Sequence, residues 1–167
     1  MARITMEVIQ HYNVIQNFLP DLGEAAERAG IPLPEEMRRS RGEGPWFHAV
    51  TSADGVFLRF AEKSFGISFA ETEITGTPGE VLSYRYYEDG TLAITGVGPE
   101  PGDVIVLKEG EKFVSDRKDP YGFALVYETQ RLEVEQLPCG ARIHLEYRVL
   151  AAGQIMEHNE VILEVSE

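Results

Sequence analysis

Residues 142–149 read Arg-Ile-His-Leu-Glu-Tyr-Arg-Val, in which polar and apolar side chains alternate without interruption. Successive side chains of a strand point to opposite faces, so this stretch predicts a strand with one buried and one solvated face, as is typical of antiparallel sheets. The same alternation recurs in Val56, Leu58 and Phe60, in Leu82, Tyr84 and Tyr86, and in Val161, Leu163 and Val165. The chain is therefore predicted to consist mainly of antiparallel strands.

Turn signals separate these segments. Glycine adopts positive φ angles easily and proline restricts φ, so short segments that contain them reverse the chain. The signals are Asp54-Gly55, Gly76 to Gly79, Asp89-Gly90, Gly98 to Gly102, Glu109-Gly110, Asp119 to Gly122, Pro138 to Gly140 and Ala152-Gly153. They predict about ten strands in a meander, and Asp-Gly pairs between apolar segments favour two-residue hairpin turns.

Between residues 123 and 137 the apolar side chains move from odd-numbered to even-numbered positions. Leu125 and Tyr127 stand at odd positions, and Leu132 and Val134 stand at even ones. Such a change needs one extra residue, which predicts a β-bulge or a sharp bend near residues 128–131. Bent strands help a sheet to close, and closure removes exposed strand edges. The predicted fold is all-β, a closed or nearly closed antiparallel barrel that forms a single domain over residues 1–167; a two-sheet sandwich is the alternative.

One short helix is predicted near the N-terminus. Asp21 and Glu24 have the spacing of a capping box, and Gly30 with Pro32 predicts the end of the helix. One face is formed by Leu22, Ala25, Ala26 and Ala29. The helix belongs to an excursion at about residues 17–44 between the first two strands. It either covers a mouth of the barrel or packs against its outer wall.

Composition limits the classes of function. The 167 residues carry a formal net charge of −13, which disfavours nucleic acid as a partner because phosphate binding depends on Lys and Arg. The sequence contains no apolar run of the length that a membrane span needs, and its first residues do not resemble a signal peptide. The protein is therefore expected to be cytoplasmic, and its one cysteine, Cys139, to be structural.

Candidate catalytic groups are few. The four histidines, His11, His48, His144 and His158, show no metal-ligand spacing, and no phosphate-binding or nucleophile motif occurs. We expect no metal, no cofactor and no catalytic residue. The remaining enzyme hypothesis is acid-base chemistry at His144 and Glu146, which share a strand face predicted to be solvated. Residues 157–160, Glu-His-Asn-Glu, are interpreted as a solvated entry to the last strand.

Aromatic residues on the predicted strands favour a binding function. Tyrosine and tryptophan combine a large apolar body with a polar tip, which suits a pocket for a mostly apolar ligand held by a few hydrogen bonds. The candidate ligand-binding residues are Trp46, Tyr84, Tyr86, Tyr127 and Tyr147. The competing interpretation is that these aromatics simply fill a small barrel. The alternative function is a structural or interaction module, including a homo-oligomer, that associates through exposed strands or the N-terminal helix.

The C-terminal half resembles a known group. The relevant elements are Asp119-Pro120-Tyr121-Gly122, Thr129, Leu132-Glu133-Val134, Gly140, residues 142–147, Gly153, Asn159 and residues 161–165, preceded by residues 84–88 and 104–110. This pattern is similar to that of the YwiB-like family of uncharacterised bacterial proteins, over roughly residues 80–167. The resemblance implies a lipocalin-like, calycin-type barrel and implies no activity or site residue. Asp119 stands where that family usually has threonine.

Overall fold

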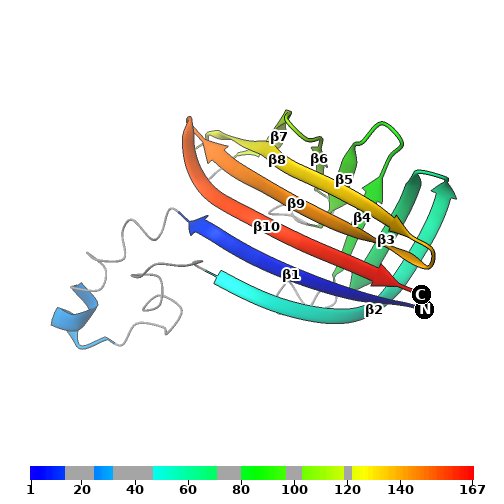
Figure 1. Cartoon of the computed structure of the whole chain (residues 1–167). Helices are drawn as coiled ribbons and strands as arrows, with labels where there is room; N and C mark the ends of the chain where they lie inside the picture. Colours follow the sequence, from blue (N-terminus) through cyan, green and yellow to red (C-terminus); the bar gives the residue numbers. More distant parts are fainter. Residues whose placement is uncertain (14–24, 32–46, 71–79, 97–102, 119–121) are drawn as a thin grey trace.

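The computed structural model describes residues 1–13, 25–31, 47–70, 80–96, 103–118 and 122–167. Ten strands account for most of them (Figure 1). They are β1 (Ala2–Asn13), β2 (Phe47–Ala61), β3 (Ser64–Ala70), β4 (Val81–Tyr86), β5 (Leu92–Thr95), β6 (Val104–Leu107), β7 (Lys112–Lys118), β8 (Ala124–Leu137), β9 (Gly140–Ala151) and β10 (Gln154–Ser166).

All ten strands form one antiparallel sheet in the order β6-β5-β4-β3-β2-β1-β10-β9-β8-β7. Every pair joins neighbours in the sequence except β1 with β10, which places Arg3 opposite Ser166 and brings the chain termini together (Figure 1). The sheet curls into a nearly closed barrel, so β6 and β7 are the edge strands that come near each other. The predicted antiparallel all-β fold is confirmed.

The two ends of the barrel differ in their connections. At one end, here called the terminal end, lie both chain termini and the turns that follow β2, β4, β6 and β8. At the other, the distal end, β1, β3, β5, β7 and β9 finish, because consecutive strands run in opposite directions. Of the connections at the distal end, the structure describes Ala152-Gly153 in full, a turn in which both residues have positive φ.

Apolar side chains fill the middle of the barrel. The largest fully buried ones come from β1, β3, β5, β6, β9 and β10, and are Ile4, Phe65, Ile67, Leu92, Leu107, Ile143, Leu145, Leu163 and Val165. They alternate with outward-facing residues, as the period of a strand requires. Burial of this apolar surface is the main stabilising contribution to the fold.

The predicted bulge and helix are confirmed where the structure describes them. The register between β8 and β9 shifts between Thr129 and Arg131, inside the predicted interval. Residues 25–29 are helical, and the helix ends at Gly30, whose φ is +69°. The capping-box residues Asp21 and Glu24 lie outside the described residues, as do most of the excursion and the position of the helix relative to the barrel mouth.

The hairpin predicted at Asp54-Gly55 is wrong. Both residues lie inside β2, and the reversal occurs at Glu62-Lys63, which carries neither glycine nor proline. A Cβ on Gly55 would lie 2.3 Å from the backbone oxygen of Ser68 and 2.4 Å from Cδ1 of Ile4. Glycine is needed here because the backbone of β2 approaches its neighbours closely, and not because the chain turns.

The inner face of β2 was also assigned to the wrong set of residues. Val56, Leu58 and Phe60 are each about half exposed, whereas Phe57 is buried opposite Ile67. Residues Ala53, Gly55 and Phe57 face inward, and two of them are small. The pattern misled because an apolar alternation on the outer wall has the same period as one on the inner wall.

Candidate functional site

A row of hydrogen-bonding side chains crosses the inner face in the distal half of the barrel. Thr129 of β8 lies opposite Tyr147 of β9, Tyr147 lies opposite Asn159 of β10, and Asn159 lies opposite Gln10 of β1. Thr129, Tyr147 and Asn159 are buried, and Gln10 is half-buried. We call these four residues the inner row. Buried polar side chains of this kind need partners to offset their desolvation.

Amide side chains satisfy most of the inner row. Gln10 Nε2 donates to Asn159 Oδ1 at 3.0 Å, and Asn159 Nδ2 donates to Glu157 Oε2 at 3.1 Å. Asn13 Nδ2 donates to Gln10 Oε1 at 3.2 Å. A hydrogen bond also joins the side chains of Tyr147 and Asn159. The network therefore reaches from β9 to the end of β1.

Thr129 is the exception in the inner row. Its side chain is 3% exposed, and its Oγ1 has no hydrogen-bond partner among the residues that the structure describes. Its backbone is held from the other side, since Gly110 N donates to Thr129 O at 2.9 Å and Thr129 N donates to Glu111 O at 3.2 Å. A buried hydroxyl without a partner is costly, so this group has hydrogen-bonding capacity that a water molecule or a ligand can satisfy.

Tyrosine rings lie beside the inner row. The ring centroids of Tyr127 and Tyr147 are 6.1 Å apart, and those of Phe113 and Tyr127 are 6.4 Å apart. Burial, together with the carboxylates of Glu157 and Asp103, raises the pKa of Tyr127 to about 12. Burial is also the main cause that raises the pKa of Tyr147. Both tyrosines therefore remain neutral hydrogen-bonding groups at physiological pH.

The predicted ligand-binding residues separate into three groups. Tyr84, Tyr127 and Tyr147 are all buried on the inner face, and the Tyr84 hydroxyl lies 3.7 Å from the sulfur of Met6. Tyr86 is half-buried at the terminal end, where it lines a hollow of about 460 Å³. Trp46 lies outside the described residues. Three of the five residues are thus brought to the same interior.

Sequence reasoning missed the polar members of the inner row. Asn159 was expected at a solvated strand entry, yet it is 6% exposed and faces the interior. It has the same parity as Val161, Leu163 and Val165, so continuing their alternation one step toward the N-terminus would have placed it inside. Gln10 extends the inward parity of Ile4 and Met6 in the same way.

The outer face carries a second polar network. His11 Nε2 lies 2.8 Å from Glu160 Oε1, and His144 Nε2 bonds to the other oxygen of Glu160. His158 Nε2 lies 2.8 Å from Glu146 Oε1. Burial opposes ionisation of Glu160, but the hydrogen bonds from the two histidines outweigh it, so the pKa of Glu160 lies below its usual value.

This network bears on the enzyme hypothesis for His144 and Glu146. Both side chains lie on the outer face, but each is bonded to a partner on β10 and not to the other. The fourth histidine, His48, lies 2.8 Å from Glu7 in the same manner. Among the residues described, no group of three or more histidine, cysteine or acidic side chains is arranged to hold a metal ion. The geometry accounts for these histidines as hydrogen-bonding partners of carboxylates.

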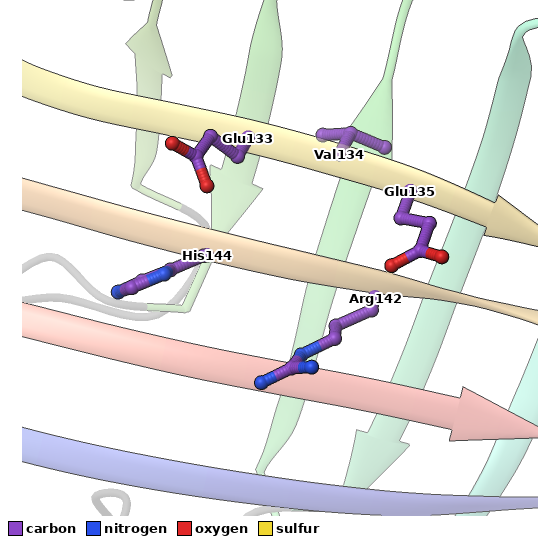
Figure 2. A pocket seen from close by; sticks show the side chains of 5 residues that line it. All are labelled: Glu133, Val134, Glu135, Arg142 and His144. Carbon is purple, nitrogen blue, oxygen red and sulfur yellow. The ribbon is translucent and has the colours of Figure 1, made fainter.

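A shallow groove of about 280 Å³ lies beside the network. Figure 2 shows Glu133 and Glu135 of β8 on the same side of the sheet as Arg142 and His144 of β9. In the register, Glu133 is opposite His144 and Glu135 is opposite Arg142. The pair of Glu135 with Arg142 places opposite charges side by side on the solvated wall.

The structure is similar to the crystal structure of the YwiB protein from Bacillus subtilis, with a TM-score of 0.61. The fold is YwiB-like. The similarity covers 99% of this chain and 89% of that chain at 8% sequence identity, so it concerns the fold alone. The sequence matches no family model and no curated protein. Within the described part of the chain, no helix has the length and apolar character needed to cross a bilayer.

Proposed function

We propose that the protein is a non-catalytic, cytoplasmic binder of a small, partly apolar molecule, held against the inner row in the distal half of a lipocalin-like barrel. The observation that supports it is the Thr129 hydroxyl, buried on the inner face with no partner among the described residues. A ligand hydroxyl or carbonyl would satisfy this group, and its apolar part would lie against Tyr127 and Tyr147.

The chemistry of the inner row favours a neutral ligand. Tyr147, Asn159 and Gln10 offer hydrogen-bonding groups that are already engaged with one another, which keeps them in place for a ligand. The carboxylate of Glu157 lies near both tyrosines and would repel an anion. We therefore expect an aromatic or aliphatic molecule with a hydroxyl, and not a carboxylic acid.

A pair of probes tests the proposal. 2-Naphthol has an aromatic body and one hydroxyl, and naphthalene lacks only the hydroxyl; binding of each is followed by probe fluorescence. The intact protein should prefer 2-naphthol, and Thr129→Val should reduce that preference by about tenfold, the effect of one lost hydrogen bond. Thr5→Val, which changes an exposed threonine of β1, serves as the control and should retain the preference.

Two results would overturn the proposal. The first is that neither probe binds. The second is that Thr129→Val and Thr5→Val show the same preference for 2-naphthol, since the buried hydroxyl would then take no part in binding. Native mass spectrometry of freshly purified protein adds an independent measurement, because a retained molecule would appear as additional mass.

A second candidate function is self-association through the outer wall of β2 to β6. Two outward rows run across these strands, and neither contains a carboxylate. They are Val56, Ser68, Ser83, Thr95 and Val104, and Leu58, Gly66, Arg85, Ala93 and Val106. Copies of a chain with net charge −13 repel one another, so these two rows, which carry no carboxylate, are where a second copy can meet the first at least cost.

Sedimentation velocity over a range of protein concentrations tests self-association. Leu58, which is 54% exposed, would be changed to Glu, and Val114, which is 60% exposed on β7, would be changed to Glu as a control with equal charge. We expect a concentration-dependent dimer that Leu58→Glu abolishes and Val114→Glu retains. A wild-type chain that stays monomeric would contradict this second candidate.

A further inference from the structure

The barrel has a gap where β8 loses its outer partner. β7 pairs with β8 only from Ala124 to Glu128, and the turn that precedes β7 covers Thr129. Beyond it, Glu109 Oε1 accepts from Leu132 N at 3.0 Å. No strand among the described residues pairs with β8 on this side after that point, although β9 pairs with it on the other side as far as Leu137. Residues 133–137 therefore form an edge without a strand partner, here called the free edge. At its end, Arg59 Nη2 of β2 donates to the backbone oxygens of Leu137 and Gly140.

The direction of the backbone groups on this edge follows from Leu132. Its N–H points away from β9, toward Glu109. N–H and C=O directions alternate along a strand, and the register from Leu132 to Leu137 is unbroken, so the backbone groups of Val134 and Gln136 point the same way. An edge of this kind is a template for another strand.

A hollow lies along the same edge. Its volume is about 460 Å³, and Val134 and Gln136 line one side of it. The opposite wall comes from β2, β4 and the turns that follow them, through Arg59, Glu62, Lys63, Tyr86 and Glu88. Side chains of an added strand would thus enter a space bounded by an aromatic ring and by the aliphatic parts of long side chains.

We propose that residues 133–137 of β8 bind an extended, basic peptide segment by strand addition, with alternate apolar side chains of the peptide in the hollow. Main-chain hydrogen bonds to Val134 and Gln136 supply the affinity, and the hollow selects alternating sequences. The outward side chains of the peptide would lie beside Glu133 and Glu135, which are exposed on the outer wall (Figure 2).

The charge that a bound peptide should carry follows from the net charge of the whole protein. The lining of the hollow contains as many basic as acidic side chains, and on the outer wall Glu133 lies 3.8 Å from Arg131 and Glu135 is opposite Arg142. Local pairs therefore do not decide the preference. The net charge of −13 does, because it attracts a basic segment and repels an acidic one at a distance.

The probe is a fluorescein-labelled peptide in which Lys and Val alternate over six residues, and binding is measured by fluorescence anisotropy. One comparison peptide has the same composition with all three Val residues adjacent, and another has Glu in place of Lys. We expect only the alternating basic peptide to bind appreciably. Equal binding of the two Lys peptides would overturn strand addition, since charge alone would then explain the interaction.

Two variants of Gln136 separate the backbone from the side chain. Gln136→Pro removes the N–H on the free edge, where proline is tolerated because no ladder hydrogen bond is lost, and Gln136→Ala keeps the N–H. We expect Gln136→Pro to weaken binding by about tenfold and Gln136→Ala to change it less than about twofold. Equal affinities for the two variants would overturn the proposal.

Hydrogen exchange on the unmodified protein provides a measurement that does not depend on the folding of a variant. Addition of the alternating peptide should slow exchange of the Val134 and Gln136 amides, because they become donors to the added strand. The amides of Glu133 and Glu135 point toward β9 and are the internal reference. Unchanged exchange at Val134 and Gln136 with bound peptide would overturn the proposal.

Discussion

Thr129 and Tyr147 lie directly opposite each other on β8 and β9 with both side chains in the interior, yet only the Tyr147 side chain has a hydrogen-bond partner among the described residues. The difference arises from their neighbours. Tyr147 has Asn159 on the adjoining strand, whereas Thr129 is flanked on its other side by the backbone of Gly110 and Glu111. The side-chain hydroxyl of Thr129, at one end of the inner row, therefore has no partner within the row.

Replacement of Thr129 should stabilise the ligand-free protein. Valine has the same branched shape without the hydroxyl, so Thr129→Val removes an unpaired buried polar group and should raise the free energy of unfolding by about 1 kcal/mol. Urea denaturation measures this change, with Thr5→Val as an exposed control. A decrease of similar size in the free energy of unfolding would mean that the hydroxyl is hydrogen-bonded in the folded protein.

Tyr127 should ionise at a higher pH than an exposed tyrosine. Burial and the nearby carboxylates raise its pKa from 10.0 to about 12 in the folded state. A raised pKa means that the stability associated with the neutral phenol is complete below pH 10 and is lost as the pH rises toward 12 and beyond. Tyrosinate absorbance near 295 nm should show this late titration and Tyr127→Phe should remove it; titration of Tyr127 near pH 10 would contradict the assignment.

Glu160 should stabilise the outer wall at neutral pH. Its pKa is lower in the folded state than its usual value of 4.5, so its contribution is present above that value and declines as the pH falls below it. We expect Glu160→Gln to lower the free energy of unfolding by about 1–2 kcal/mol at pH 7, with a smaller difference at pH 3.5. A pH-independent difference in thermal stability would show that its charge is not responsible.

Gly55 should not tolerate a side chain. The Cβ of alanine would overlap the Ser68 oxygen and the Ile4 side chain, so Gly55→Ala should destabilise the protein by about 2 kcal/mol or more. Gly66→Ala on the paired strand is the control, because its Cβ would meet the outer end of the exposed Phe60 ring at 3.0 Å. Equal melting temperatures for the two variants would refute the close approach at Gly55.

The fold was predictable because strand period and turn chemistry are local. Glycine turns at Asp89-Gly90 and Glu109-Gly110 were located correctly, and both glycines have positive φ. The bulge near Thr129 followed from the change of parity alone. Gly55 shows the limit of local reasoning, since the need for glycine there comes from Ser68 and Ile4, which are neighbours only after folding.

The candidate site was predictable only in part. Tyr84, Tyr127 and Tyr147 were predicted to line the interior because they are aromatic residues on predicted strands, and they are buried there. The polar network around Tyr147 was not predicted. Its partner Asn159 was expected in a solvated segment, and Gln10 meets Asn159 only through the pairing of β1 with β10. The hydrogen bonds of His144 and Glu146 were missed because their partners, Glu160 and His158 of β10, lie in the segment that was interpreted as a solvated strand entry.

The pairing of β1 with β10 also constrains the order of assembly during synthesis. β1 leaves the ribosome long before β10, which is its neighbour on one side. Until β10 has been made, β1 presents an open edge to other nascent chains, and the loop that must close contains all eight strands between them. Sheets that depend on such non-local contacts fold slowly, so chaperones have a long interval in which to act on this chain.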